Sequence, residues 1–484
     1  MKENYPINVI QGLVVVPRLL ASGNQFMREG RLIDAMQAYG EFLLMTPQLS
    51  KIVAPNIART RQLYRANRAK SVALRVGVCG WELAHNAAGR AHTLALLYEQ
   101  FASVEIIGCL DAKIGREIWL PLRNSKIPTH TIVIDEWRDF FNQAVRLVIA
   151  NPYDVIHLSK PRAPNIIFGI LYKIFWGAKI LVDVDDEELA FVNEIAPLSI
   201  AEHLEMSDYL PILDDLAGKT WTRLSVGMAK DFDGVTISND ALKTRYGGLI
   251  IHHARNENLY RPSEQLRRNS RKRFGISQAK KVIIFFGTPR PHKGLLETAR
   301  AISYLQRDDI LFAIFGEFPD PSFKDRLNAV LGVNYLFFGD QPFEDVPEIV
   351  AMADVCVLLQ QDDSNAARFQ TPAKLGDALG MRVPVIATDT IALADVFAAQ
   401  AIMATTANQL HIALSRVLDD DIVAQNLANA GRCYFDQKIS FSHNVSELSQ
   451  LINETKSRSL GYSLRTVAGG LSEKLLAELI ENSG

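Results

Sequence analysis

The stretch GTPRPHKG, residues 287–294, combines two glycines with several cationic side chains. It follows the apolar run KVIIFF and precedes LLETARAISYL, whose apolar spacing predicts an amphipathic helix. Gly287 would permit a tight turn, while Arg290 and Lys293 would donate charge-assisted hydrogen bonds to an anion near the positive end of that helix. These residue types in this order predict a diphosphate-binding site.

The spacing within this stretch differs from that of a Walker A loop. The pattern GxxxxGK[ST] is absent, and Gly294 stands where such loops carry Ser or Thr. Kinase or ATPase chemistry is therefore disfavoured. The plain alternative is that Lys293 is a surface lysine in front of a helix.

A second stretch, TPAKLGDALGMRVPVIATD at residues 371–389, places polar groups at the start of another predicted helix. Thr371, Lys374 and the first backbone amides of that helix would face phosphate. Asp377, one turn into the helix, would accept hydrogen bonds from both hydroxyls of a ribose. Together the two stretches predict a site for a nucleoside diphosphate.

Acidic residues crowd the end of the strand-like run KILVDVDDEELAF, which holds Asp183, Asp185, Asp186 and Glu187. A DxD pattern can hold a divalent cation on a diphosphate. We expect no metal here, because the cationic side chains and the helix end already supply that positive charge. Asp185 and Asp186 are instead predicted to line a ligand pocket as catalytic residues. The alternative is a structural cap on the next helix.

Two weaker candidates lie in the same half of the chain. The loop CGWELAHNAAGRAHTLALL places Gly80 and Gly89 before a helix and would direct backbone N–H groups, including that of Gly89, at an anion. It is not GxGxxG, and it contains no intact dinucleotide fingerprint. His157, at the end of DVIHLSK, is more simply interpreted as a buried structural histidine than as a catalytic one.

Short β-branched runs alternate with helical stretches in two series, the first from about residue 73 and the second from about residue 281. This alternation is typical of parallel sheets with helices on both faces. A chain of 484 residues also exceeds what one hydrophobic core can organise. We therefore predict an α/β fold with two Rossmann-like, doubly wound domains at residues 71–255 and 256–454. Ligands of such sheets bind beyond the carboxyl ends of the strands, where the candidate residues fall.

The two ends of the chain do not follow this alternation. The segment GNQFMREGRLIDAMQAYGEFLLMTP spaces Gly23 and Tyr39 as a tetratricopeptide repeat does, so residues 1–70 are predicted to form a helical segment. One repeat cannot bury its own face, so this segment must dock on the body of the protein or on a partner. Residues 455–484 form a tail that contains the amphipathic run LSEKLLAELIEN.

Charge and composition limit the possible partners and the location. Because 52 basic residues face 54 acidic ones, no global field recruits nucleic acid or an anionic membrane. The basic run at residues 261–277 is interpreted as a solvated helix face rather than a nucleic-acid site. Four cysteines without a CxxC pair suit a reducing compartment and argue against structural zinc.

The apolar stretch at residues 163–182 raises the question of a membrane segment. It contains lysines and glycines, so we interpret it as a helix at 165–176, a break at Gly177 and a buried strand at 179–183. A helix on the membrane surface is the alternative. No secretory signal opens the chain, so the predicted location is cytoplasmic, with peripheral attachment to the inner membrane as an option.

At these motifs the sequence resembles the GT-B glycosyltransferases of the retaining group 1 type, over about residues 73–453. The resemblance implies two Rossmann-like domains that face a cleft, with the nucleotide-sugar donor on the second domain and the acceptor on the first. Lys293 matches the diphosphate-binding lysine of that family, and Asp377 stands at the position of its ribose-binding glutamate. The sequence departs from the family at two positions. Thr288 stands where the family has an arginine, so Arg290 would have to take over the role of that arginine. Phe369 stands where the family has an acidic residue that touches the donor sugar.

The resemblance implies an enzyme that moves a sugar from a nucleoside diphosphate sugar to a hydroxyl acceptor, in the synthesis of bacterial surface polysaccharide or lipid-linked glycan. Lys293 would stabilise the leaving diphosphate as a catalytic residue, with no cofactor besides the donor substrate. The expected partners are that donor and a glycan or lipid-linked acceptor, with a protein or membrane contact through residues 1–70. A nucleotide-sugar 2-epimerase and a non-catalytic binding or scaffold protein remain the alternatives.

Overall fold

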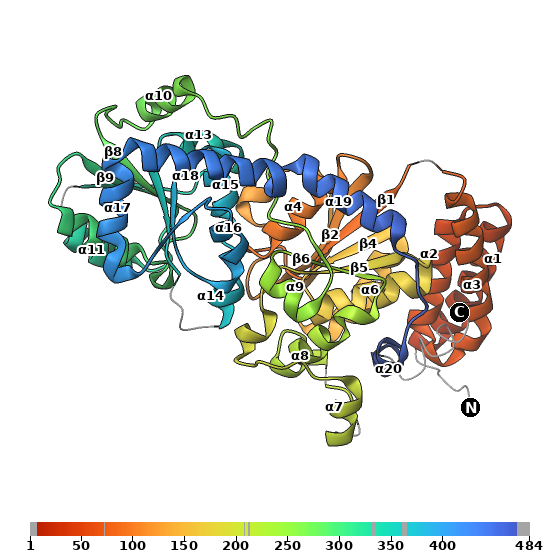
Figure 1. Cartoon of the computed structure of the whole chain (residues 1–484). Helices are drawn as coiled ribbons and strands as arrows, with labels where there is room; N and C mark the ends of the chain where they lie inside the picture. Colours follow the sequence, from red (N-terminus) through yellow and green to blue (C-terminus); the bar gives the residue numbers. More distant parts are fainter. Residues whose placement is uncertain are drawn as a thin grey trace. The chain divides into compact units, whose positions relative to one another are not determined.

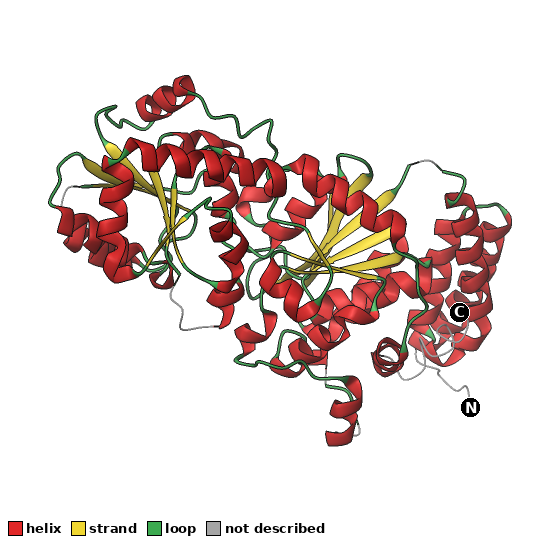
Figure 2. Cartoon of the chain, viewed as in Figure 1, coloured by secondary structure: helices red, strands yellow, loops and turns green. Residues whose placement is uncertain are grey.

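The computed structural model describes residues 7–71, 73–207, 209–211, 213–331, 334–360 and 365–471. The chain forms two compact units, each built around one parallel sheet with helices beside it (Figures 1 and 2). Unit 1 contains residues 1–184, 188–236 and 451–484, and unit 2 contains residues 185–187 and 237–450. The predicted α/β class with two doubly wound domains is confirmed.

The first sheet has the strand order β3-β2-β1-β4-β5-β6-β7. Its strands are β1 (Arg75–Gly80), β2 (Ser103–Asp111), β3 (Thr129–Ile134), β4 (Val155–Ser159), β5 (Lys179–Val184), β6 (Gly234–Ile237) and β7 (Leu249–Ile250). The helices of unit 1 are α1 (Ile7–Arg28), α2 (Leu32–Met45), α3 (Ser50–Arg68), α4 (Ala88–Tyr98), α5 (Phe140–Ala150), α6 (Ala163–Trp176), α7 (Ile200–Met206), α8 (Lys219–Met228) and α20 (Tyr462–Leu471). The strand order reverses between β1 and β4, which is where such sheets bind ligands.

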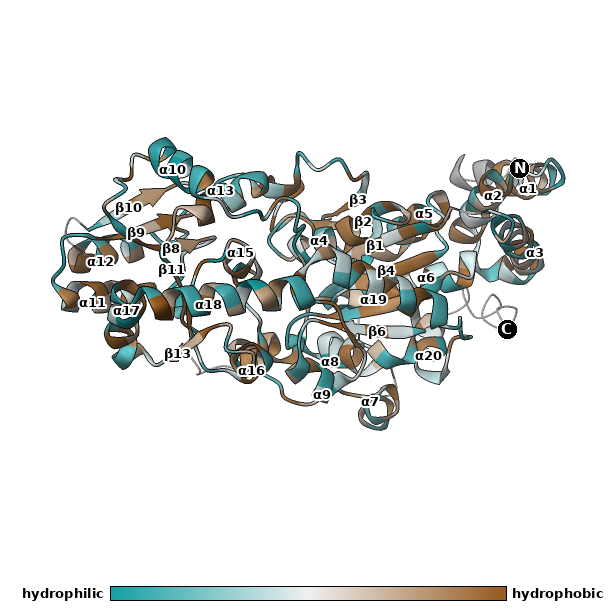
Figure 3. Cartoon of the chain, turned by 45° about the horizontal axis from the view of Figure 1, so that its top comes forward, coloured by the Kyte–Doolittle hydropathy of each residue, from teal (hydrophilic) through white to brown (hydrophobic). Residues whose placement is uncertain are grey.

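The second sheet has the strand order β10-β9-β8-β11-β12-β13. Its strands are β8 (Lys281–Phe286), β9 (Ile310–Phe315), β10 (Tyr335–Phe338), β11 (Val355–Leu358), β12 (Val385–Thr388) and β13 (Met403–Thr405). The helices are α9 (Asp240–Tyr246), α10 (Glu264–Arg273), α11 (Leu295–Leu305), α12 (Pro321–Leu331), α13 (Val346–Ala351), α14 (Asn365–Phe369), α15 (Lys374–Gly380), α16 (Ala394–Ala398), α17 (Leu410–Asp419), α18 (Asp421–Tyr434) and α19 (Phe441–Glu454). Here the order reverses between β8 and β11. Because parallel strands are buried on both faces, their runs are mostly apolar, as the brown colour of β4 in Figure 3 illustrates.

The apolar stretch at residues 163–182 folds as predicted into α6, a left-handed break at Gly177 (φ +62°) and β5. Every residue of α6 is buried, because the helix packs against α3, α5 and α8. The alternative of a helix on the membrane surface is therefore wrong. Among the residues that the structure describes, no helix has the length and apolar character needed to cross a membrane.

The N-terminal helices dock on the body of unit 1. In the hairpin of α1 and α2, a Cβ added at Gly23 would lie 2.5 Å from the Tyr39 ring, so only glycine permits this approach. The helix α2 packs on α5 and α3 packs on α6, and Arg68 pairs with Asp154 at 2.6 Å. Docking on the body is thus observed, while the likeness to a tetratricopeptide repeat remains a prediction.

The division between the units differs from the predicted boundary at residues 255 and 256. It falls after Thr236, although β7 (Leu249–Ile250) still belongs to the first sheet, and Arg255 pairs with Asp377 of unit 2. The chain also returns to unit 1 after Gln450, where Lys179 donates to the carbonyl of Ile452 and Asp233 accepts from the amide of Arg458. Almost all of the amphipathic run at 471–482 lies outside the described residues.

The basic run forms α10, but its arginines are not simply solvated. Arg271 is 1% exposed and pairs with Asp354 at 2.8 Å, and Arg267 pairs with the same carboxylate at 2.7 Å. Arg273 pairs with Asp345 and Glu348 at the surface. The interpretation as a solvated helix face is therefore only partly right, since this helix is anchored to unit 2 by ion pairs.

Candidate active site

The loop that follows β8 has the predicted glycine turns. Gly287 has φ +94° and its amide donates to the carbonyl of Phe315 at 2.9 Å. Gly294 has φ +67° and immediately precedes α11, and a Cβ added there would lie 2.2 Å from the Cβ of Leu359. Both positions combine a left-handed backbone with a close approach, which only glycine tolerates without strain.

Two lysines from different elements converge on this turn. Lys293, in a 3-10 turn, donates from Nζ to the carbonyl of Thr288 at 2.9 Å. Lys374 reaches over from the start of α15, and a Cβ added at Gly287 would lie 3.1 Å from its Nζ. The same Nζ lies 5.0 Å from the centre of the Phe285 ring. The structure therefore brings together Gly287, Lys293 and Lys374, as the sequence predicted.

The electrostatics of the turn suit an anion. Burial, with added repulsion from Lys374 and Arg290, lowers the pKa of Lys293 to about 7. Burial also lowers the pKa of Lys374. His292 experiences burial and the same three cations, which lower its pKa. An anion bound among these groups would relieve their mutual repulsion, and the amino end of α11 adds positive potential.

Asp377 is bound by protein side chains. It is 4% exposed, and its Oδ1 lies 2.5 Å from Nε of Arg255. Its Oδ2 accepts from Nη2 of Arg255 at 3.1 Å, and Oδ1 also accepts from the Tyr260 hydroxyl at 2.5 Å. Both oxygens are thus engaged by protein donors, and the contact of this carboxylate with a ribose remains a prediction.

Thr371 belongs to a network that holds the loop before α15. Its hydroxyl accepts from Nδ2 of Asn239 at 3.1 Å and donates to the carbonyl of Ala392 at 3.4 Å. Asn239 also donates to the carbonyl of Phe369 at 2.9 Å and caps α9 through its side-chain oxygen. Thr371 thus has a positioning role in this structure, and its predicted contact with the donor remains untested.

Phe369 occupies the position at which the resemblance leads one to expect an acidic residue. Its ring centre lies 5.5 Å from the guanidinium carbon of Arg245. Nε of Arg245 lies 2.8 Å from a carboxylate oxygen of Glu187, which also accepts from the hydroxyl of Tyr246. The guanidinium of Arg245 therefore lies over the ring of Phe369, at the position where the resemblance implies a carboxylate that binds the sugar hydroxyls.

In unit 1, Asp183 is fully buried at the carboxyl end of β5. It accepts two hydrogen bonds from Arg90, both at 2.8 Å, and one from Thr236 at 2.7 Å. Burial alone would raise the pKa of Asp183, but the Arg90 guanidinium outweighs it and holds the pKa below its ordinary value. This carboxylate is therefore a structural anchor, which removes the first residue of the DxD pattern from any metal.

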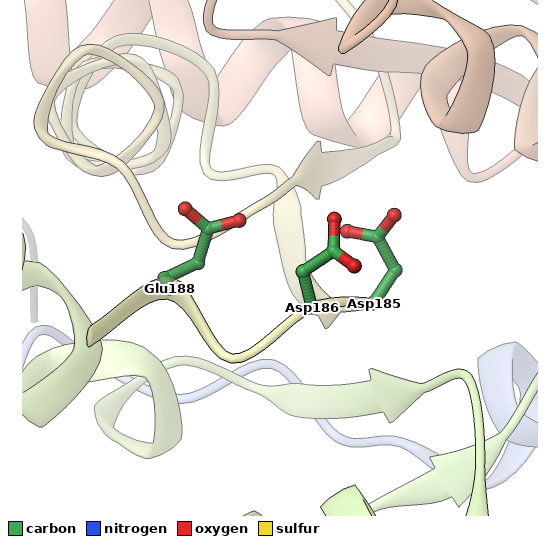
Figure 4. Close-up of side chains that lie close together, drawn as sticks. All are labelled: Asp185, Asp186 and Glu188. Atoms are coloured by element: carbon green, nitrogen blue, oxygen red, sulfur yellow. The ribbon is translucent and has the colours of Figure 1, made fainter. Parts of the chain in front are cut away.

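The acidic residues that follow β5 lie close together on one loop. Oxygens of Asp185, Asp186 and Glu188 lie within 4.8 Å of one another, a spacing that a cation could use (Figure 4). Glu188 already pairs with Arg162 at 2.5 Å and with Lys160 at 3.3 Å. These two cations neutralise Glu188. The absence of a metal and the catalytic roles of Asp185 and Asp186 remain predictions.

The two weaker candidates have structural surroundings. The amides of Ala88 and Gly89 donate to the carbonyls of His85 and Asn86, so the prediction that Gly89 offers a free amide to an anion is wrong. The reason is that turns beginning at His85 and Asn86 use these donors in the first turn of α4. His157 is fully buried between the hydroxyls of Tyr98 and Thr236, and burial lowers its pKa to about 4. It is a neutral structural histidine.

Three residues of this region were not found from the sequence. Gly316 follows β9 with φ +133°, and a Cβ there would lie 2.5 Å from the carbonyl oxygen of Gly287. Its place after an apolar strand could have indicated it. Arg255 and Tyr260 bind Asp377 from 122 and 117 residues away, and no local pattern marks them.

Residues 267–433 match the sequence model of the family described as glycosyl transferases group 1. The match lies within unit 2 and identifies a group 1 glycosyltransferase domain there. The matched range contains the 287–294 loop, Lys374 and Asp377. No curated protein matches the sequence.

Solved structures share the fold of this glycosyltransferase at low identity. HepE of Anabaena, in complex with UDP and glucose, is 14% identical with a TM-score of 0.56, over 78% of this chain and 99% of that one. WaaG, a glycosyltransferase of lipopolysaccharide biosynthesis, is 14% identical with a TM-score of 0.52, over 78% and 99%. A Listeria monocytogenes protein described as a UDP-N-acetylglucosamine 2-epimerase is 12% identical with a TM-score of 0.51, over 80% and 98%. The chain has the GT-B fold and contains a group 1 glycosyltransferase domain.

Proposed function

We propose that this protein transfers a sugar from a nucleoside diphosphate sugar to a hydroxyl acceptor during the assembly of a bacterial surface polysaccharide or a lipid-linked glycan. The observation that carries the proposal is the convergence of Lys293 and Lys374 on the Gly287 turn, inside a group 1 domain. The complexes of HepE with UDP and with UDP-glucose support uridine diphosphate sugars as the first donors to test. The role of WaaG in lipopolysaccharide biosynthesis supports a surface glycan as the product.

The chemistry follows from where charge develops. As the bond between the anomeric carbon and the diphosphate oxygen breaks, negative charge grows on the departing diphosphate. Lys293, Lys374 and the amino end of α11 are preorganised to stabilise that charge, which is the largest contribution a fixed site can make. The anomeric carbon bonds to the acceptor oxygen, whose hydroxyl proton is released. We assign the sugar or acceptor contact to Asp185 and Asp186.

The donor is tested first by thermal shift with uridine, guanosine, adenosine and thymidine diphosphate sugars. The donor that raises the melting temperature is then incubated with the enzyme and with candidate glycan or lipid-linked acceptors. Release of nucleoside diphosphate that requires an acceptor is the expected result. The same release without any acceptor, together with an altered sugar, would instead indicate the 2-epimerase, which shares the fold.

A non-catalytic binding protein is the second candidate. The engagement of Asp377 by Arg255 and the stacking of Arg245 on Phe369 favour it, because both residues depart from the family at donor contacts. Donor binding without turnover against every acceptor tested would support that candidate. We expect turnover, since neither departure touches the two lysines that face the diphosphate.

A further inference from the structure

A second cationic pocket lies in unit 1, within a part of the chain that the catalytic site does not use. It has a volume of about 400 Å³, large enough for a nucleotide or a phosphorylated headgroup. The residues that line it include Arg61, Arg65, Lys173, Ser457, Arg458 and Ser459. They come from α3, from the last turns of α6 and from the segment that leads to α20. Both α3 and α20 pack against α6 (Figure 1).

The charged side chains that line this pocket, Arg61, Arg65, Lys173 and Arg458, are all cationic. No acidic side chain is among the described residues that line it. Lys173 is 8% exposed, with its Nζ 2.5 Å from Asp233 and 2.8 Å from the hydroxyl of Ser457. Burial lowers the pKa of Lys173, and the nearby charge of Arg65 lowers it further, although Asp233 opposes both effects. Arg65 also pairs with Asp154 at 3.2 Å. The four cations that line the open volume still outnumber these two acidic partners, which favours an anionic ligand.

The backbone beneath the pocket is arranged to keep the arginines in place. Gly177 has φ +62°, and a Cβ there would lie 3.6 Å from Cδ of Arg61 and 3.8 Å from Cγ of Arg65. The aliphatic parts of both arginine side chains therefore pass over the backbone of Gly177, which has no side chain. Arg61 is also fixed by a 2.8 Å hydrogen bond to the carbonyl of Ile174. Arginines held in this way lose little freedom when they bind a ligand.

We propose that this pocket binds a phosphate group, presented either by an anionic lipid headgroup or by a soluble phosphorylated compound. Guanidinium forks and an ammonium group are the donors that phosphate oxygens select, and two hydroxyls lie among them. The pocket exists because α3 of the N-terminal segment and residues 457–460 of the tail meet on α6. Those two segments thereby acquire a role that the two sheets alone do not require.

The test is calorimetric titration of the full-length protein with pyrophosphate. Because pyrophosphate can also enter the donor site, the titrations use the Lys293→Ala protein beside the wild type. Arg458→Glu reverses the charge of an exposed pocket residue, and Arg59→Glu makes the same change on an exposed residue of α3 that does not line the pocket. We expect binding to persist in Lys293→Ala, to weaken at least about tenfold when Arg458→Glu is added, and to stay unchanged with Arg59→Glu.

Sedimentation with phosphatidylcholine vesicles, with and without phosphatidylglycerol, identifies the source of the phosphate. Retention on the anionic vesicles that Arg458→Glu abolishes and Arg59→Glu preserves assigns the pocket to a lipid headgroup. Pyrophosphate binding without such retention assigns it to a soluble compound. The proposal is overturned if the Lys293→Ala protein binds no pyrophosphate, or if Arg458→Glu and Arg59→Glu bind it equally well. Donor binding by the wild type is measured separately, so a failure here leaves the proposed transferase function in place.

Discussion

Lys293 and Asp377 were both predicted to touch the donor, yet their surroundings in unit 2 are opposite. Lys293 lies among other cations, which together with burial bring its pKa to about 7. Asp377 lies between Arg255 and Tyr260, and the guanidinium of Arg255 already neutralises its charge. A buried charge among like charges gains from a ligand of opposite sign, whereas a buried ion pair gains little. The comparison supports the proposals that Lys293 acts in the chemistry and that Asp377 stabilises the framework.

The largest effect is expected for Lys293→Ala. Loss of one preorganised donor to the leaving group costs roughly 3 to 4 kcal/mol, so turnover should fall by about a hundredfold or more while the melting temperature barely changes. Steady-state kinetics with the stabilising donor measures this, with Arg300→Ala, an exposed residue of α11, as the control. Near-normal turnover in Lys293→Ala would remove the main support for the catalytic assignment.

Asp377→Ala is expected to act on stability instead. It leaves Arg255 buried without its partner, which should cost about 3 kcal/mol of the free energy of unfolding. Urea unfolding and the melting temperature measure the loss, and Asp377→Asn, which keeps the shape and part of the hydrogen bonding, should lose less. If Asp377→Ala keeps wild-type stability but raises the Michaelis constant for the donor, the carboxylate binds ribose after all.

The pH dependence of donor affinity sharpens the comparison further. Since Lys293 has a pKa of about 7 in the free protein and a bound diphosphate raises it, donor binding takes up a proton. Affinity should therefore be highest below pH 7 and fall by up to about tenfold per pH unit above it. Calorimetry between pH 6 and 9 measures the slope, and Lys293→Arg, which stays charged, should flatten it. A slope that Lys293→Arg leaves unchanged would point to another titrating group.

The smallest effect is expected from metal chelation. Asp183 is bound by Arg90 and Glu188 by Arg162 and Lys160, so these two carboxylates of the acidic region already have positively charged partners. We expect transfer activity to persist in excess EDTA. Loss of activity that manganese restores would give Asp185, Asp186 and Glu188 a metal-binding role, for which their oxygens are close enough.

Much of the candidate site could be predicted because its signals are local. The turn glycines, Lys293 and the start of α11 occupy eight consecutive residues and the helix that follows them, and Lys374 opens a helix directly after another loop. The sequence reasoning failed where a predicted donor was already used by a nearby backbone group. Gly89 was expected to offer its amide to an anion, but a turn three residues earlier already uses that donor.

The sequence by itself determined the strands, the helices and the glycine turns, because periodicity and backbone conformation depend on neighbouring residues. Only the tertiary structure decided which charges are paired. Arg90 reaches Asp183 across 93 residues and Arg255 reaches Asp377 across 122, and the tail returns to Asp233 in unit 1. Such pairs are set by the packing of whole elements against one another, and the energy of a buried charge depends on that packing rather than on its spacing along the chain.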